Sequence, residues 1–338
     1  MSRPSTFPHR SKTVQSLESV VHRKKVNFVV YGLWTIVSGL VFLAGCGSKF
    51  TYPANGVPKS IEKICRDEFQ IDATARIVGK TVGALLYVRS IVDPKGQIAS
   101  EVHDKMGKVM QTVTRVALST DLQVDYCVVV IRDTSQGNEL TIVRALEDTK
   151  RANADAIGIE ESINRTLFQQ GRTQPNLSNG KNFVLKEIKT ENFIAEQIAQ
   201  RIRFGFAKDP KDSANKPLNL VDGAFHEEHG KRIFRFSLIA LKLDRSHQNI
   251  LNVFRTVNEV FAGYQFASFD ELEVNDYLNR EKLVVDPQTL LDYRTKKISD
   301  NQLLEKCLQE SQSVQEAFKL FGFSTPAEGN DTASQVAR

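Results

Sequence analysis

The sequence predicts an α+β protein in which helices cover antiparallel-leaning sheets. One observation is size, because a chain of 338 residues with 41% apolar side chains can bury a large core. A second is a pair of short apolar runs, 123–132 and 139–146, joined by the turn-forming residues 135–138 as in a hairpin. A third is that stretches with helical apolar spacing stand before, between and after the expected strands in both halves of the chain.

The first half predicts the order helix, strand, helix, strand, strand, helix. Pro58 suits the opening turn of the first helix, Ser100 the N-cap of the second and Gly171 the end of the third. The expected elements are a helix over 58–70, a strand over 75–89, a helix that starts at Ser100, strands over 123–132 and 139–146, and a helix over 162–170.

The second half predicts the same order. Its expected elements are a helix over 191–203, a strand over 232–243, a helix capped by Ser246, strands over 269–274 and 282–285, and a helix over 300–321 with Ser299 and Gln302 in capping-box spacing. Four apolar positions of the central helix, Ile250, Phe254, Val257 and Phe261, repeat Val102, Met106, Val109 and Val113 at a constant offset of 148 residues.

This repeat predicts two related α-β-α-β-β-α modules. The modules cover 58–170 and 183–323, with a linker over 171–182 between them and a disordered tail over 324–338. Coincidence is the alternative, because all amphipathic helices share this spacing.

The start of the chain has the order of an export signal. The cations Arg23, Lys24 and Lys25 precede the uncharged apolar run 26–45, which ends in Leu43-Ala44-Gly45-Cys46. This order resembles a bacterial lipoprotein signal peptide. The resemblance implies a signal peptide over 1–45, cleavage between Gly45 and Cys46, and fatty acyl chains on Cys46. An uncleaved transmembrane helix over 26–45 is the alternative, since 20 residues can just span a bilayer.

The anchor also predicts a location in the cell envelope. The cations before the apolar run hold the leader's start in the cytoplasm, so the remainder faces the periplasm. Gly47 and Ser48 follow Cys46, without the aspartate that retains many inner-membrane members of the lipoprotein family, and this favours the outer membrane. Residues 46–57 then predict a tether that reaches no more than roughly 40 Å. The expected partners are the membrane, through the lipid anchor, and envelope proteins.

The distribution of charge argues against a nucleic-acid partner, with a local basic patch as the open alternative. The formal net charge is +5, but residues 1–25 hold six Lys and Arg against the single Glu18, and residues 26–45 hold no charge. The other 39 basic and 39 acidic residues balance, so the chain from Cys46 onward lacks the surplus of cations that phosphate binding requires.

Motifs for catalysis or cofactors are weak. Val78-Gly79-Lys80-Thr81 is similar to the end of a P-loop, but the earlier glycine is absent, so we expect no nucleotide and no other cofactor. His226-Glu227-Glu228-His229 is the only tight cluster of metal-ligand types, with its histidines three rather than four residues apart. His226 and His229 are therefore weak metal candidates, and a solvated turn is the plainer interpretation. No catalytic residue is assigned.

Apart from Cys46 the sequence has an odd number of cysteines, so they cannot all form disulfides within one chain. Cys127 lies in an apolar run and is expected to be a small buried hydrophobe. Cys65 and Cys307 fall on expected helices and can pair only if those helices touch.

The sequence favours a binding or assembly module over a catalyst. Parts of 76–133 also resemble envelope lipoproteins of unassigned function, and this resemblance implies no catalytic residues. One alternative is an envelope hydrolase, with a metal-dependent site in 205–230 as one form of it. Another is a solute-binding lipoprotein that grips a ligand between two lobes, which would have parallel sheets.

Overall fold

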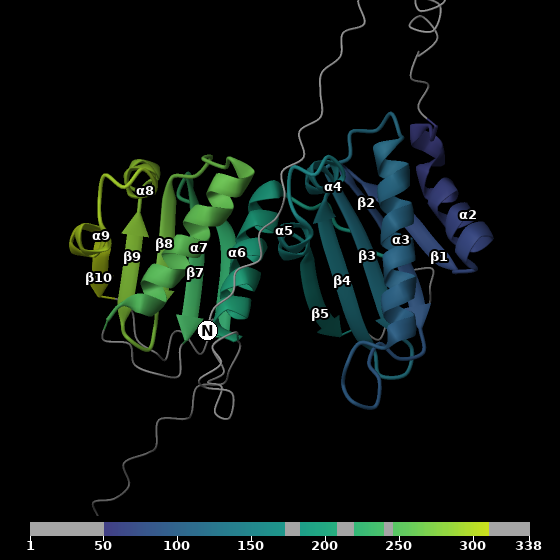
Figure 1. Ribbon diagram of the computed structural model, residues 1–338, viewed down its shortest axis with the longest axis horizontal. Coiled ribbons are helices and arrows are strands. Elements are labelled where there is room, and N and C mark those ends of the chain that lie inside the picture. Colours follow the sequence, from purple (N-terminus) through teal and green to yellow (C-terminus); the bar gives the residue numbers. More distant parts are fainter. Residues whose placement is uncertain (1–50, 173–182, 208–219, 240–245, 311–338) are drawn as a thin grey trace, which may run out of the picture. The chain divides into compact units, whose positions relative to one another are not determined.

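Two five-stranded mixed sheets follow one another along the chain (Figure 1). The computed structural model describes residues 51–172, 183–207, 220–239 and 246–310. The strand orders are β1-β2-β3-β4-β5 and β10-β9-β8-β7-β6. One neighbouring pair in each sheet is parallel, β2 with β3 and β7 with β8, and the other pairs are antiparallel. The predicted α+β class with antiparallel-leaning sheets is confirmed.

The elements of the first half are η1 (Ala54–Gly56), α2 (Val57–Phe69), β1 (Ala73–Val78), β2 (Thr81–Val88), α3 (Ser100–Leu118), β3 (Tyr126–Asp133), β4 (Asn138–Ala145), α4 (Leu146–Asn153), α5 (Ile159–Asn164) and β5 (Leu167–Arg172). Those of the second half are α6 (Thr190–Ala207), β6 (Leu220–Glu228), β7 (Lys231–Ile239), α7 (Gln248–Tyr264), β8 (Glu271–Asp276), β9 (Glu281–Val285), α8 (Pro287–Arg294), α9 (Asp300–Cys307) and β10 (Leu308–Glu310).

The two halves repeat one topology. Each has the order α-β-β-α-β-β-α-α-β, which is longer than the predicted α-β-α-β-β-α by one strand near the start and by a helix and a strand at the end. The offset of 148 residues between α3 and α7 falls to 141 between α4 and α8, whose first residues are Leu146 and Pro287. The same 141 relates the N-caps Gly158 and Ser299 and the first residues of β5 and β10. The repeat predicted from one helix therefore extends through most of the fold.

The predicted single strand over 75–89 is wrong, because the chain turns back at Gly79 and Lys80. Gly79 has φ +54°, a left-handed conformation that glycine adopts without strain, and β1 and β2 pair on either side of it. The turn of the second half is His229-Gly230, with φ values of +52° and +77°. The first turn lies within a largely apolar run, so the sequence pattern predicts one continuous strand there.

Several other boundaries also differ from the predictions. The helix expected over 162–170 is short α5 followed by the edge strand β5, because Leu167 onward pairs with β4. The segment between α6 and β7 contains the strand β6, which was not predicted. The helices α4 and α8 were not predicted either. Ser100 and Ser246 are not N-caps, because the N-cap of α3 is Ala99 and that of α7 is His247. The predicted capping box of Ser299 and Gln302 is confirmed. The expected helix over 300–321 ends at Cys307, and residues from 311 onward lie outside the described chain.

The first sheet is buried on both faces. Cys127, Val129 and Ile131 of β3 point into a core with α2 and α3, and Figure 1 shows α3 lying across this sheet. Tyr126, Val128 and Val130 point the other way, into a core that contains Phe183, Phe193 and the second sheet. At Gly83 of β2 an added Cβ would lie 2.7 Å from a methyl carbon of Leu185, so the glycine allows residues 183–188 to approach.

The second sheet carries ion pairs on the face opposite α7. Arg235 of β7 donates from Nε to Glu273 Oε2 of β8 at 2.6 Å, and Lys282 Nζ of β9 lies 2.8 Å from Glu273 Oε1. In the first sheet the topologically equivalent face is largely apolar and covered, with one ion pair from Arg132 Nε to Glu139 Oε2 at 2.7 Å, so the two repeats differ in what packs on this face.

The three described cysteines are buried free thiols. A disulfide between Cys65 and Cys307 is therefore not formed. Burial raises the pKa of Cys127 to about 12, which agrees with its predicted role as a small buried hydrophobe.

Residues 52–57, the last part of the predicted tether over 46–57, belong to the described fold. Tyr52 N donates to Ser119 O at 3.1 Å, η1 occupies Ala54–Gly56 and α2 starts at Val57. The chain is thus attached to the fold from Tyr52 onward, while residues 46–50 lie outside the described part. Among the described helices none is long and apolar enough to cross a membrane.

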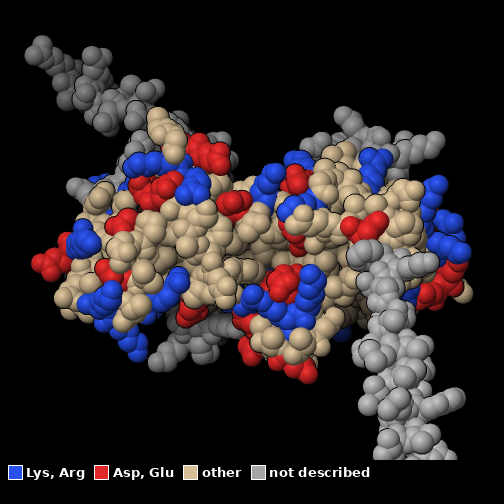
Figure 2. Space-filling model, turned by 90° about the horizontal axis from the view of Figure 1, so that it is seen from above, with Lys and Arg blue, Asp and Glu red and all other residues tan. Residues whose placement is uncertain are grey.

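Charges of both signs are interspersed on the face seen in Figure 2. Lys and Arg side chains lie beside Asp and Glu side chains there and form no continuous basic surface. This view agrees with the balanced charge of the chain after residue 45.

A pH-dependent contribution to stability is expected at Asp133. The desolvation of this carboxylate is outweighed by hydrogen bonds from Ile91 N, Ser135 N and Gln136 N, so its pKa is lowered. A lowered pKa stabilises the fold above the unfolded value of about 3.9 and loses this effect as the pH falls. Asp133→Asn should lower the free energy of unfolding by about 2 kcal/mol at pH 7 and by less at pH 3. Chemical denaturation at both pH values measures this.

The control is Asp72→Asn, since Asp72 is exposed and pairs with Arg66 only at 3.6 Å. It should change the free energy of unfolding by under about 0.5 kcal/mol at either pH. Equal losses for Asp133→Asn at both pH values would contradict the assignment.

Candidate functional site

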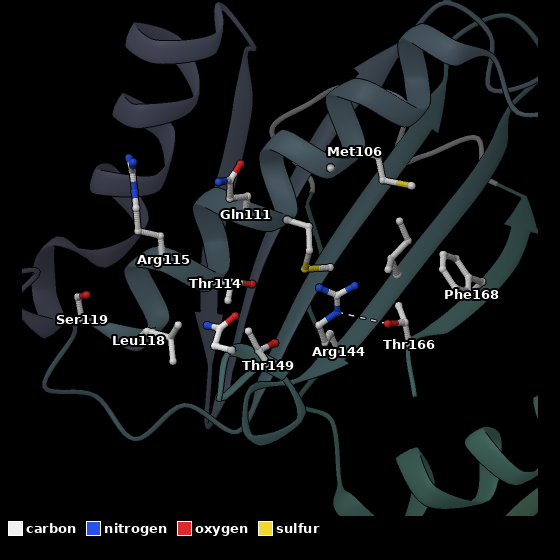
Figure 3. Close-up of a pocket in the computed structure, with 14 residues that line it drawn as sticks. Met106, Gln111, Thr114, Arg115, Leu118, Ser119, Arg144, Thr149, Thr166 and Phe168 are labelled. Carbon is white, nitrogen blue, oxygen red and sulfur yellow. Dashed lines mark hydrogen bonds between the residues drawn. The ribbon is translucent and has the colours of Figure 1, made fainter. Parts of the chain in front are cut away.

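A pocket of roughly 540 Å³ lies between α3 and the strands β4 and β5 (Figure 3). Most of the exposed surface of its wall is apolar, although eight of the fourteen lining residues have polar or charged side chains. Its wall includes Met106, Met110, Thr114, Ile142, Arg144, Thr149, Thr166 and Phe168. Such a combination is typical of small-molecule sites.

Arg144 is the central polar group of this pocket. Its Nε donates to Thr166 Oγ1 at 3.3 Å, and it forms no ion pair with a carboxylate in the described part of the chain. Burial lowers the pKa of Arg144, since few groups there compensate the loss of water around the cation. Most N–H donors of this guanidinium are thus available to an anion, which it can bind with two parallel hydrogen bonds.

Two threonine hydroxyls in the same wall have unused hydrogen-bonding capacity. Thr149 Oγ1 is buried and has no hydrogen-bond partner among the described residues. Thr114 Oγ1 is buried without a conventional partner as well, and its neighbour is the Cys127 thiol. A buried hydroxyl without a partner costs roughly 1–3 kcal/mol, so these groups favour a bound polar ligand.

The position of Arg144 follows from the alternation along β4. Leu140 and Ile142 point toward α3 and are buried in its core, and Arg144 is the next residue in phase with them. Arg144 was not among the site residues predicted from the sequence. The available signal was an arginine at a position that the two-residue period assigns to the apolar face.

The second half provides an internal comparison for the pocket. With the offset of 141, Thr149 and Thr166 correspond to Leu290 and Cys307, and with that of 148 Thr114 corresponds to Ala262. Leu290 and Cys307 are buried apolar residues of the core. The polar wall of the pocket is therefore a property of the first half and not of the shared topology.

Arg144 has no counterpart in the second half. The strand pair Val129–Ile142 of the first half is equivalent to the pair Leu272–Val285 of the second half. Three residues separate Ile142 from α4, whereas only Asp286 separates Val285 from α8. The extra two residues contain the position of Arg144. A local lengthening of β4 accompanies the cation.

A second hollow of roughly 340 Å³ also has Arg144 in its wall. Ile157, Ile159 and Ile163 line it beside α5. Ile159 and Ile163 are 83% and 55% exposed, so apolar surface leads from the solvent toward the guanidinium.

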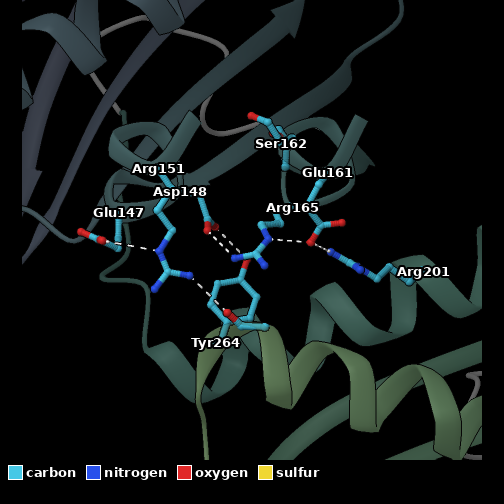
Figure 4. Close-up of polar contacts among 10 residues, drawn as sticks. Glu147, Asp148, Arg151, Glu161, Ser162, Arg165, Arg201 and Tyr264 are labelled. Atoms are coloured by element: carbon cyan, nitrogen blue, oxygen red, sulfur yellow. Dashed lines mark hydrogen bonds and ion pairs between the residues drawn. The ribbon is translucent and has the colours of Figure 1, made fainter. Parts of the chain in front are cut away.

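A buried polar cluster holds the residues next to the pocket (Figure 4). Asp148, which precedes Thr149, accepts hydrogen bonds from Arg165 Nη1 and Tyr264 Oη, both at 2.8 Å. Arg165 also donates from Nε to Glu161 at 2.7 Å, and its guanidinium lies 4.8 Å from the centre of the Tyr264 ring. Since Tyr264 belongs to α7, the second half supports the pocket of the first.

Gln200 of α6 supports the opposite wall. Its Nε2 donates to Thr166 O at 2.8 Å, and its Oε1 accepts from Phe168 N at 2.8 Å. One side chain thus satisfies the backbone on both sides of Leu167, where the chain enters β5. The position of Thr166, which holds Arg144, depends on this amide.

The site residues predicted from the sequence lie elsewhere. Gly45 and Cys46 fall outside the described residues. His226 lies in β6 and His229 in the turn after it, and the nearest contact is between His226 Nδ1 and Glu228 Oε1 at 3.6 Å. No group of three metal-ligating side chains occurs in the described ranges, so these histidines gain no support as ligands. Val78-Gly79-Lys80-Thr81 forms the β1–β2 turn, not a loop before a helix.

Loss of the Asp148 carboxylate should be strongly destabilising. Asp148 and Arg165 side chains are 3% and 7% exposed, so Asp148→Ala leaves a buried cation without this partner. We expect the free energy of unfolding to fall by about 3–5 kcal/mol, measured by denaturant titration. Asp104→Ala, which removes an exposed partner of Lys108, is the control and should cost under about 0.5 kcal/mol. Similar losses in both variants would contradict the structural role of Asp148.

Comparisons with known proteins identify no family for this chain. No family model matches it, and no curated protein matches it either. A solved structure, that of the sex pheromone staph-cAM373 precursor, aligns with 64% of this chain and 71% of its own at 7% identity and a TM-score of 0.20. A likeness of this size supports no conclusion about fold or function.

Proposed function

We propose that this protein is a lipid-anchored envelope protein that acts as a binding module, and that its ligand presents an anionic group to Arg144. The main support for this proposal is that the guanidinium of Arg144 lies in a largely apolar pocket and has no ion-pair partner among the described residues. The unpartnered hydroxyl of Thr149 in the same wall supports it. Keeping such a cation costs stability, and a ligand that neutralises it explains its presence.

The anchor is the part of the proposal that rests on the sequence. Acyl chains on Cys46 would hold the domain at the periplasmic side of a membrane, with the outer membrane favoured by Gly47 and Ser48. Confinement to a surface raises the local concentration of partners there, so weak contacts with envelope proteins become effective.

The structure offers less to the two alternatives. The lining of the larger pocket contains no Asp, Glu or His, so it lacks a general base for hydrolysis. A solute-binding protein of the parallel-sheet kind would need a different fold, because the pairs here are mostly antiparallel. Binding without catalysis fits the described groups best.

Replacing Arg144 by an apolar residue should stabilise the unliganded protein. Arg144→Met keeps a long side chain and removes a desolvated cation, so we expect the free energy of unfolding to rise by about 1 kcal/mol. Arg89→Met, at an exposed position, is the matched loss of charge and should have little effect. Thermal or chemical denaturation decides this, and a clear loss of stability on Arg144→Met would indicate a structural role instead.

Mass spectrometry of the membrane-bound protein tests the anchor. We expect a mature chain that begins at Cys46 and carries acyl chains. Cys46→Ser should remain uncleaved and unacylated, while Cys65→Ser should be processed as usual because it leaves Leu43-Ala44-Gly45-Cys46 unchanged. An uncleaved wild-type chain would overturn the lipoprotein assignment and leave the ligand proposal in place.

A further inference from the structure

Resting on the proposed function, the geometry points to a single-chain amphiphile with a carboxylate headgroup as the ligand of the pocket. The headgroup binds Arg144 and the hydroxyls beside it, and the aliphatic chain lies along the apolar wall formed by Met106, Met110 and Phe168. Three features of the site lead to this ligand class.

The charge of the pocket matches a monoanion. Arg115 is the other cation in the wall, but its Nη atoms lie 2.7 and 3.2 Å from the carboxylate oxygens of Glu68. Arg144 thus supplies the one positive charge among the described lining residues that has no direct ion pair, and the Asp148 carboxylate outside the wall attracts it only through space. A carboxylate matches one guanidinium in charge and in its planar two-oxygen geometry.

The apolar wall matches a flexible chain. Met106 and Met110 are unbranched and can adapt to a chain of variable conformation, and the Phe168 ring faces the same space (Figure 3). A small polar anion such as inorganic phosphate would leave this surface in contact with water. The volume of roughly 540 Å³ also exceeds what a carboxylate group alone occupies.

The surroundings match a ligand that arrives from an apolar phase. Ile159 and Ile163 are exposed beside the second hollow, and Arg144 lines both spaces. The wall of that hollow also contains Asp155 and Ser162, so its apolar surface comes chiefly from Ile157, Ile159 and Ile163.

The test uses the full chain in phosphatidylcholine nanodiscs and a dodecanoate probe that carries a photoreactive diazirine. Butyrate, octanoate, dodecanoate, dodecanol and dodecyl phosphate compete for labelling, and empty nanodiscs correct for partition into lipid. We expect octanoate to displace the probe at a free concentration about 250-fold below that of butyrate, since it has four more methylenes and each buried methylene contributes roughly fourfold. Dodecanol, which lacks the charge, should not compete, and dodecanoate should compete better than dodecyl phosphate.

Variants connect the result to the site. Arg144→Met should reduce labelling by at least tenfold, while Arg89→Met leaves it unchanged. Met106→Gln should weaken binding of dodecanoate more than that of butyrate. Peptide mapping should place the label on residues 100–118 or 159–172. Thermal melting of each variant confirms that it is folded.

The outcomes separate the two proposals. Competition that requires Arg144 but does not depend on chain length overturns the amphiphile and leaves an anion-binding module. Stronger competition by dodecyl phosphate than by dodecanoate overturns the carboxylate headgroup. Labelling that is indifferent to Arg144, or that maps to other segments, overturns both proposals.

Discussion

Two-sided burial of the first sheet is the constraint on which this architecture depends. β3 is apolar on both faces, so covering one face with α2 and α3 leaves Tyr126, Val128 and Val130 still to be covered. Residues 183–188 and α6 cover that second face, and Gly83 allows their close approach. Docking α6 there brings Gln200 and Arg201 to the first half, and with α7 it brings Tyr264 to Asp148. The supports of the pocket follow from the burial of this sheet.

Duplication explains where a site can arise in such a fold. In the second half, buried Leu290 and Cys307 fill the space that corresponds to the pocket. The contact equivalent to the Arg165–Asp148 ion pair is the weaker hydrogen bond from Lys306 to Thr289 at 3.1 Å. The first half has threonines at the two equivalent positions, and its strand β4, which carries Arg144, is longer than β9. One copy can lose core packing and gain a polar hollow while the other retains the packed arrangement.

Local patterns in the sequence predicted the class of the fold, the helix α3, the β3–β4 pair and the repeat. They failed where tertiary pairing decides the structure. Leu167 onward has a helical pattern in isolation and becomes an edge strand only because β4 offers it a partner. The turn at Gly79 is hidden in an apolar run, and β6 lies in a segment without a strong period. Arg144 was overlooked for a different reason, because its meaning depends on the burial of its neighbours on the same face of β4.

Because residues of the second half cover the first sheet, the order of synthesis affects when the first half can finish folding. A nascent polypeptide that ends at Arg172 contains every strand of the first sheet, yet Val128 and Val130 have nothing to cover them. Completion of the amino-terminal half must wait for α6 to emerge. Because synthesis proceeds from the amino terminus, the earlier repeat can bury this face only after the later repeat has been made.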